Sequence, residues 1–441
     1  MRKIIFDIIS ELKSSKYLKN ILVLSSGVGI SQLIPLIALP FLTRFFSPYD
    51  FGVLAIFLAL TQLIAISSTL RLEMAVVLPK KNTDAAILCL NAFVLLVITS
   101  VLVFFILYFL WKFLENNNSF YFNKLYDIKI WMSQLSNKNY FPLLIILVPF
   151  ASFFLGLYNI LYAWNNRVEM YKNMSFSHLY HSIFSTPLSI FFYFTKLKIF
   201  ALILGQIIGR FVACVSLATS IIGEIKKIDL KNIFVNSRFL VHFYKKFIIY
   251  ETPHSILNFF SQKIILAFFT FSFGFFVVGV FDLADKIIGK PLGIISNSLK
   301  TVYYKRITTA QNKHLIFVKS VVLMSLVCSV VIIPFFLLNN EFYIFLFGPN
   351  WGDTALFVKM LCPLLFFRFV SNVVTPSISY KMENQILLIW QIFYLVALLV
   401  LFLFFNFKSV NQMIFIYSIT GACMYFILGI LSYLTLKKYI S

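Results

Sequence analysis

Charged residues are scarce in this chain of 441 residues. They make up only 12% of the sequence, whereas 60% is hydrophobic and the mean hydropathy is +0.90. A soluble protein of this length is about a quarter charged, so an ordinary cytosolic enzyme is excluded. Among the charged residues the acidic ones are the scarcer. The chain has 16 Asp and Glu against 38 Lys and Arg, which gives a net charge of +22. No basic domain or tail gathers this charge, so we expect no nucleic-acid partner.

The patterns of common catalytic sites are absent as well. No G-x-x-x-x-G-K-[ST] loop occurs, so we expect no ATP hydrolysis, and no Ser/His/Asp or Cys/His spacing indicates a nucleophile. The five cysteines lie in apolar runs, which predicts buried, reduced packing residues. His178 and His181 are spaced as metal ligands can be, but no carboxylate or cysteine completes a site, so packing is the favoured role. We predict no catalytic residue and no bound metal.

Long apolar runs are abundant instead. Twelve runs of 18 or more residues are each long enough to span a bilayer. They cover residues 20–43, 51–70, 85–110, 141–163, 174–195, 199–223, 247–270, 274–299, 315–338, 354–380, 385–406 and 411–435. The aromatic residues are spread evenly, which favours lipid contacts and interface belts. The first run is a full span without a cleavage site, so we expect no cleavable signal peptide.

The positions of Lys and Arg predict the orientation in the membrane. Both termini and the loops on their side hold 23 basic residues, whereas the loops on the other side hold 8. Both termini are therefore predicted to be cytoplasmic. Residues 1–19 mix isoleucines with lysines, which predicts an amphipathic segment at the membrane surface. The longest external loop, near 111–140, is too short for an independent domain.

An internal repeat favours two lobes. Residues 63–71 resemble residues 292–300, with four of nine positions identical at an offset of 229 residues, and Gly52 and Gly279 are 227 residues apart. Two parallel repeats of six spans enclose a central cavity in some transporters. We therefore predict an all-α integral membrane protein with twelve transmembrane helices in two six-helix lobes around a central cavity. The predicted parts are an N-lobe at 20–223, a cytoplasmic linker at 224–246, a C-lobe at 247–436 and a C-terminus at 437–441.

The eighth span carries the densest polar stripe. Charged groups at membrane depth are costly and usually face a cavity. At helical spacing one face collects Asp282, Asp285, Lys286, Lys290 and Asn297. Asp282 and Asp285 can each pair with Lys286, which leaves Lys290 without an obvious local partner. An ion-pair stripe packed against another helix is one interpretation, and a wet cavity wall is the favoured one.

Two further spans carry milder polar faces. In the seventh span Glu251, His254, Asn258 and Gln262 share a face, and Lys263 lies off it. In the first span Gln32 belongs to a weaker stripe of the same kind. These residues are predicted to line the cavity. Asp282, Asp285 and Glu251 are the candidates for coupling an ion to transport, since binding of a cation there changes their charge.

Two arginines lie deep in other spans. Arg210 is near the middle of the sixth span, too far from either end to snorkel comfortably, and Arg368 in the tenth span shares a face with polar residues. Lys319 and Lys359 lie near span ends and are more consistent with snorkelling anchors. We predict that the cations which bind the substrate are Arg210, Lys263, Lys286, Lys290 and Arg368. Their excess over the acidic residues predicts an anionic substrate, and phosphate suits such donors.

Residues 40–80 resemble a known family. The segments Pro40-Phe-Leu-Thr-Arg44, Ser47-Pro-Tyr-Asp-Phe-Gly52 and Leu70-Arg-Leu-Glu-Met-Ala-Val-Val-Leu-Pro-Lys80 are similar to the N-terminal signature of Wzx-type polysaccharide flippases. These belong to the multidrug/oligosaccharidyl-lipid/polysaccharide exporter superfamily. The motif positions carried over by the resemblance are Arg44, Asp50, Gly52, Arg71, Glu73 and Pro79. Their places at loop edges favour gating or packing roles over sugar contact.

The resemblance implies a function without an enzymatic step. Members of the family translocate an undecaprenyl-pyrophosphate-linked oligosaccharide, for O-antigen or capsule, across the bacterial inner membrane. The resemblance implies alternating access, coupling to H⁺ or Na⁺ without another cofactor, and contact with membrane lipids. It also makes the polymerase and chain-length regulator of the same pathway candidate partners. A cation-coupled drug exporter of the same fold is the close alternative, and an oligosaccharide polymerase or glycosyltransferase is less favoured.

Overall fold

The computed structural model describes residues 16–116, 140–197, 199–226, 233–245, 247–309, 312–380, 383–405, 407 and 409–437. Within these residues the regular structure is helical and contains no β-strand. The α-helices are α2 (Lys16–Phe45), α3 (Pro48–Ser68), α4 (Leu72–Ala75), α5 (Asn82–Asn116), α7 (Tyr140–Arg167), α8 (Tyr171–Phe192), α9 (Ile199–Ala218), α10 (Ile222–Ile225), α11 (Ile233–Phe243), α12 (Thr252–Thr309), α13 (Lys313–Leu337), α14 (Asn340–Phe347), α15 (Thr354–Val374), α16 (Pro376–Tyr380), α17 (Asn384–Phe404) and α18 (Val410–Lys437). Two π-helical turns, η2 (Tyr193–Leu197) and η3 (Phe247–Glu251), and one 3₁₀ turn, η4 (Pro349–Trp351), complete the set.

Each of the twelve predicted spans coincides with a helix. Ten helical stretches of the described chain are long and apolar enough to cross a membrane. One of them, Phe247–Thr308, contains two predicted spans, because α12 is broken at Gly274 (φ 82°, ψ 177°). The span predicted at 174–195 corresponds to α8, which is rich in serine and is not among the ten. The prediction of an all-α membrane protein is thus confirmed at the level of its helices.

The described part of the chain packs into two compact units. Unit 1 contains residues up to Ile37 and Phe57–Ile256, and unit 2 contains Ala38–Ile56 and the residues from Leu257 onward. The chain passes between the units within α2, α3 and α12. The lobe boundaries predicted from the sequence remain predictions. The amphipathic segment lies outside the described residues up to residue 15, as do 117–139 of the external loop, 227–232 and 246 of the linker, and the last four residues.

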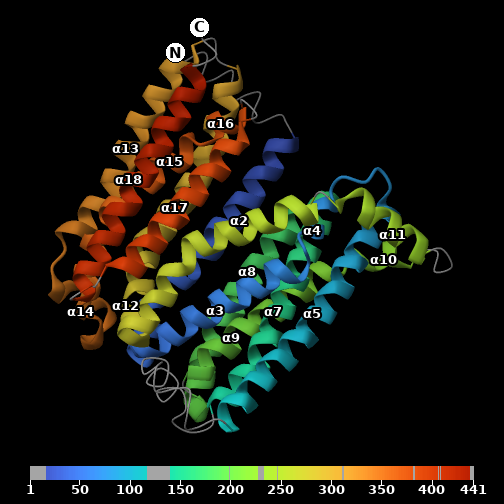
Figure 1. Ribbon diagram of the computed structural model, residues 1–441, viewed down its shortest axis with the longest axis horizontal. Helices are drawn as coiled ribbons and strands as arrows, with labels where there is room; N and C mark the ends of the chain where they lie inside the picture. The colour runs from blue at the N-terminus through green and yellow to red at the C-terminus, as the bar shows by residue number, and fades with distance from the viewer. Residues whose placement is uncertain are drawn as a thin grey trace. The chain divides into compact units, whose positions relative to one another are not determined.

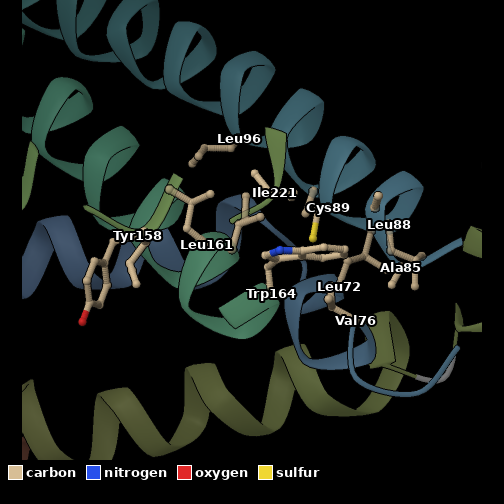
Figure 2. Close-up of a cluster of buried hydrophobic side chains, with 14 of the residues drawn as sticks. Leu72, Val76, Ala85, Leu88, Cys89, Leu96, Tyr158, Leu161, Trp164 and Ile221 are labelled. Atoms are coloured by element: carbon tan, nitrogen blue, oxygen red, sulfur yellow. The ribbon is translucent and has the colours of Figure 1, made fainter. Parts of the chain in front are cut away.

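Unit 1 has its core where α4, α5, α7 and α9 meet. Figure 2 shows the Trp164 ring of α7 enclosed by Leu88 and Cys89 of α5 and by Leu72 and Val76. The Trp164 side chain is 0% exposed. Burial of such a large ring, at roughly 25 cal/mol per Å² of apolar surface, fixes α7 firmly against α4 and α5.

Helices α8 and α9 of unit 1 run side by side (Figure 1) because small residues line their contact. A Cβ atom on Gly205 of α9 would lie 2.1 Å from Ser189 Oγ, and one on Gly209 would lie 2.8 Å from the His181 carbonyl oxygen. Close approach of small residues is how helices associate where lipid removes the hydrophobic driving force. The serines that make α8 less apolar than other spans therefore have a packing role.

Unit 2 contains a similarly close crossing between the start of α3 and α12. A Cβ atom on Gly52 would lie 1.9 Å from the Phe275 carbonyl oxygen, and one on Gly279 would lie 1.8 Å from that of Pro48. Gly52 and Gly279, the two glycines at corresponding positions of the repeat, thus lie at the same contact between α3 and α12. Helices α15 and α18 of this unit also lie side by side (Figure 1).

Candidate functional site

The charged residues predicted in the eighth span form two ion pairs in unit 2. Lys286 pairs with Asp282 one turn earlier on α12. Arg368 of α15 donates from Nη2 to Asp285 Oδ1 at 3.0 Å. Asp285 was expected to be able to pair with Lys286, and it pairs with Arg368 of α15 instead, a contact between residues 83 positions apart that helical spacing cannot predict. A Cβ atom on Gly289 would lie 3.3 Å from both Arg368 Nη2 and Asp285 Oδ1, so glycine leaves room for this pair.

Two lysines of unit 2 remain without an acidic partner. Lys290 is exposed and Lys263 is half-buried, and no carboxylate of the described residues lies within 4.0 Å of either ammonium group. Counting both ion pairs, the described face of α12 and α15 therefore carries an excess of positive charge. Such a face attracts an anion and repels a cation.

Buried tyrosines lie in the same unit as this charged face. Tyr394 of α17 and Tyr417 and Tyr425 of α18 are buried, and the rings of Tyr394 and Tyr425 are 5.7 Å apart. Ser371 of α15, one turn after Arg368, donates to the Tyr425 carbonyl oxygen. The interpretation of the aromatic residues as lipid contacts is wrong for these three. Their even spacing in the sequence gave no signal of burial.

An amide network joins α12 to α17 in unit 2. Asn258 Oδ1 accepts hydrogen bonds from Gln262 Nε2 at 2.9 Å and from Gln391 Nε2 at 2.7 Å. Gln391 is buried, and it also contacts Ser261 Oγ at 3.3 Å. Gln391 was not among the residues predicted to line the cavity, although an amide within the apolar run of α17 was a usable signal.

Arg210 of α9 belongs to unit 1 and has a different environment. Its guanidinium lies 4.6 Å from the centre of the Tyr158 ring, a cation–π contact. The Tyr158 hydroxyl is 3.2 Å from Ser177 Oγ and 3.3 Å from His178 Nε2. No carboxylate of the described residues pairs with Arg210. The groups that the structure places beside it include the Tyr158 ring and the Cys214 thiol.

The α3–α4 corner of unit 1 holds the second half of the family motif. Arg71 donates from Nε to Ser255 Oγ at 2.9 Å and from Nη1 to Glu73 Oε1 at 3.3 Å. Glu251 lies 3.8 Å from His254, and both side chains are more than a third exposed. The face predicted for the seventh span is therefore divided, since Asn258 and Gln262 belong to unit 2.

The first half of the motif has a structural role in unit 2. Ser47 and Asp50 form a capping box at the start of α3, in which Asp50 Oδ2 accepts from the backbone N–H and the hydroxyl of Ser47 at 2.9 and 2.8 Å. Pro48 then occupies the first helical position, where a missing N–H costs nothing. Arg44 donates to the Phe345 carbonyl oxygen at 2.9 Å.

Some predicted residues have simpler environments. Gln32 is half-buried on α2 and Asn297 is exposed on α12.

Among the described residues, no group of three His, Cys, Asp or Glu is arranged to hold a metal ion. Four of the five free cysteines are buried as expected, but Cys423 is exposed on α18, because helical spacing in an apolar run does not distinguish lipid-facing from core-facing positions.

Comparison with known proteins places the chain in a family. The profile described as polysaccharide biosynthesis protein matches residues 17–311, more than half of the chain. No curated protein matches the sequence significantly.

Solved structures share the fold across nearly the whole chain. The lipid II flippase MurJ in an inward closed conformation has a TM-score of 0.69 and 14% identity, over 95% of this chain and 87% of that one. An inward-facing multidrug resistance MATE family transporter of the MOP superfamily has a TM-score of 0.61 and 14% identity, over 95% of both chains. A MOP superfamily transporter from Pyrococcus furiosus, described as having a binding pocket of reverse polarity, has a TM-score of 0.60 and 13% identity, over 96% of both. At such identities the likeness establishes the fold, which confirms the predicted fold class.

The helices, their apolar lengths and the family match agree with one another. This chain belongs to the polysaccharide biosynthesis protein family and is a multi-pass membrane protein with the fold of MOP-superfamily transporters.

Proposed function

We propose that this protein is a flippase, which moves an undecaprenyl-pyrophosphate-linked oligosaccharide for O-antigen or capsule across the bacterial inner membrane by alternating access. The observation that carries the proposal is the excess of positive charge at membrane depth. Lys263 and Lys290 have no acidic partner among the described residues of unit 2, and Arg210 has none in unit 1. An unpaired cation in a membrane is costly unless an anion binds to it.

The pyrophosphate group is the anion that suits these residues. Lysine ammonium and arginine guanidinium groups both form charge-assisted hydrogen bonds to phosphate oxygens. The family match to polysaccharide biosynthesis proteins and the fold shared with a lipid II flippase support a lipid-linked glycan. The protein is then a transporter and not an enzyme, and the excess of Lys and Arg on one side of the spans supports cytoplasmic termini.

The proposal is tested with purified protein in liposomes. A fluorescent polyprenyl-pyrophosphate oligosaccharide is placed in the inner leaflet, and a membrane-impermeant quencher reports its arrival in the outer leaflet. We expect wild-type protein to accelerate this arrival and Lys290→Gln to slow it about tenfold, since a charged hydrogen bond contributes roughly 1.5–3 kcal/mol.

The matched control is Lys319→Gln. It removes an exposed lysine of α13 that is not among the cations proposed to bind the pyrophosphate. This variant should translocate the lipid like wild type. Equal slowing in both variants, or export of cationic drugs without lipid translocation, contradicts the proposal and favours a drug exporter of the same fold.

A further inference from the structure

The α3–α4 corner is held in a costly backbone conformation. Leu70 and Arg71 follow each other with φ values of +47° and +56°, in the left-handed region that non-glycine residues avoid. Each such residue costs on the order of 1–3 kcal/mol and persists only where its surroundings hold it. Here the Arg71 side chain provides that hold, because it bridges Glu73 of α4 and Ser255 of α12.

Glu73 is an unusual carboxylate in this corner. It is only 4% exposed, and its single described partner is Arg71, which reaches Oε1. The other oxygen, Oε2, is buried without a hydrogen-bond partner among the described residues, as is the hydroxyl of Thr69 four residues earlier in the chain. A buried carboxylate oxygen without a partner is costly while ionised, and a proton removes that cost.

The three carboxylates predicted to couple an ion differ from Glu73. Asp282 and Asp285 form ion pairs as Glu73 does, but their side chains are 13% and 38% exposed, whereas that of Glu73 is 5% exposed. Glu251 is 37% exposed and lies 3.8 Å from His254, so it is not a buried carboxylate. Among these four carboxylates, Glu73 alone combines burial, an unpaired oxygen and a link to another helix.

We propose that Glu73 is the proton-binding residue of this protein, and that Arg71 transmits its protonation state to α12 through Ser255. Proton binding at Glu73 does not depend on the proposed flippase function. Only the coupling of that proton to lipid transport rests on it. A metal cation suits the corner poorly, because the Arg71 guanidinium lies 3.3 Å from Glu73 and no second carboxylate contacts Glu73 among the described residues.

The charged and titratable groups around Glu73 are few. Helix α4 packs against α5, α7 and η3, which contribute Cys89, Arg167 and Glu251, and His254 follows η3 on α12. Arg167 is engaged by the carbonyl oxygens of Val76 and Val77 at 3.0 and 3.2 Å. Among the described residues, Arg71 is therefore the cation in direct contact with the Glu73 carboxylate.

The coupling follows from the two hydrogen bonds of Arg71. When Glu73 is ionised it attracts Arg71, which keeps the first turns of α12 tied to the corner through Ser255. When Glu73 takes a proton at Oε2 this attraction is lost, and the left-handed residues are released from their hold. Linkage is reciprocal, so a movement of α12 that draws Arg71 away from Glu73 favours proton uptake.

The first test is spectroscopic and independent of transport. Infrared spectra of purified protein are recorded over a pH series, with Glu73→Gln compared with Glu341→Gln, which changes an exposed glutamate of α14. We expect a buried carboxylic-acid C=O band that grows as the pH falls in wild type and Glu341→Gln and is missing in Glu73→Gln. The same band in all three proteins overturns the proposal, even where the transport assay fails for another reason.

The second test uses the liposome assay with and without a pH gradient. Wild-type protein should be accelerated by the gradient, on the order of 5–150-fold for a coupling of usual size. Glu73→Gln should equilibrate the lipid at one rate regardless of the gradient. Ser255→Ala should keep the infrared band yet lose the acceleration, which also decides the matter where Glu73→Gln does not fold. Full acceleration in Ser255→Ala shows that Arg71 does not transmit the proton signal.

Discussion

The two deep arginines, Arg210 in unit 1 and Arg368 in unit 2, have different partners. Arg368 bonds to the Asp285 carboxylate at 3.0 Å, whereas Arg210 lies over the Tyr158 ring without a carboxylate among the described residues. Both positions looked alike by depth in the sequence. The difference shows that depth identifies candidate cations, while the partner decides which of them keeps a charge for a substrate. By this criterion three cations are available to bind a substrate anion: Arg210, Lys263 and Lys290. Arg368 serves chiefly to position Asp285.

The sharpest test of this comparison removes available cations from both units. The double variant Arg210→Ala with Lys290→Ala should slow lipid translocation by about two orders of magnitude or more, since two charged hydrogen bonds of roughly 1.5–3 kcal/mol each are lost. The protein should still reach the membrane in normal amount. Quantification of surface polysaccharide and of membrane-bound protein in cells measures both. Unchanged polysaccharide in this variant rules out a role of these two cations in translocation.

The second test breaks the ion pair that distinguishes the arginines. Asp285→Asn leaves Arg368 without its carboxylate, and we expect a loss of stability of about 1–2 kcal/mol. This is less than the roughly 3–5 kcal/mol of a fully buried pair, because the Arg368 and Asp285 side chains are 30% and 38% exposed. Thermal unfolding in detergent measures the change. Arg210→Met, which removes an unpaired charge, should leave the unfolding temperature equal or higher, and a larger loss in this variant contradicts the comparison.

The third test concerns the ring under Arg210. Tyr158→Leu removes the cation–π contact, worth about 0.5–2 kcal/mol, and should lower translocation severalfold. Tyr158→Phe keeps the ring face and is the matched control, although it loses the hydroxyl contacts to Ser177 and His178. Equal rates in the two variants show that the ring does not hold Arg210.

The smallest effect on translocation is expected at Lys286. Its ammonium group is already paired with Asp282 one turn away on the same helix, so it attracts an anion less strongly than the unpaired Lys290 does. Lys286→Gln should therefore change translocation less than Lys290→Gln does. The liposome assay compares the two directly, and a larger effect of Lys286→Gln means that the paired lysine is the one that binds substrate.

The features that could be predicted from the sequence are those between residues close together in the chain. Each apolar run coincides with a helix, because a helix of about 20 apolar residues spans the hydrocarbon core of a bilayer. The Asp282–Lys286 pair was predictable from helical periodicity. The capping box of Ser47 and Asp50 has a sequence signature too, although its role emerged only with its hydrogen bonds.

Tertiary contacts decided the rest. Asp285 and Arg368 are 83 residues apart, and Asn258 and Gln391 are 133 apart, so neither pair has a periodic signal. The repeat also failed to predict backbone shape. Leu70 and Arg71 are left-handed, whereas their counterparts Leu299 and Lys300 continue the helix α12. The difference arises because Arg71 has Glu73 and Ser255 to hold it.

The most direct test of the central claim is a binding measurement. Native mass spectrometry of the purified protein compares retention of polyprenyl pyrophosphate with that of the corresponding uncharged polyprenol and of a cationic drug. The account predicts retention of the pyrophosphate lipid, weakened about tenfold or more by each of Arg210→Ala and Lys290→Ala. Equal retention of the uncharged lipid, or preferred retention of the cationic drug, contradicts it.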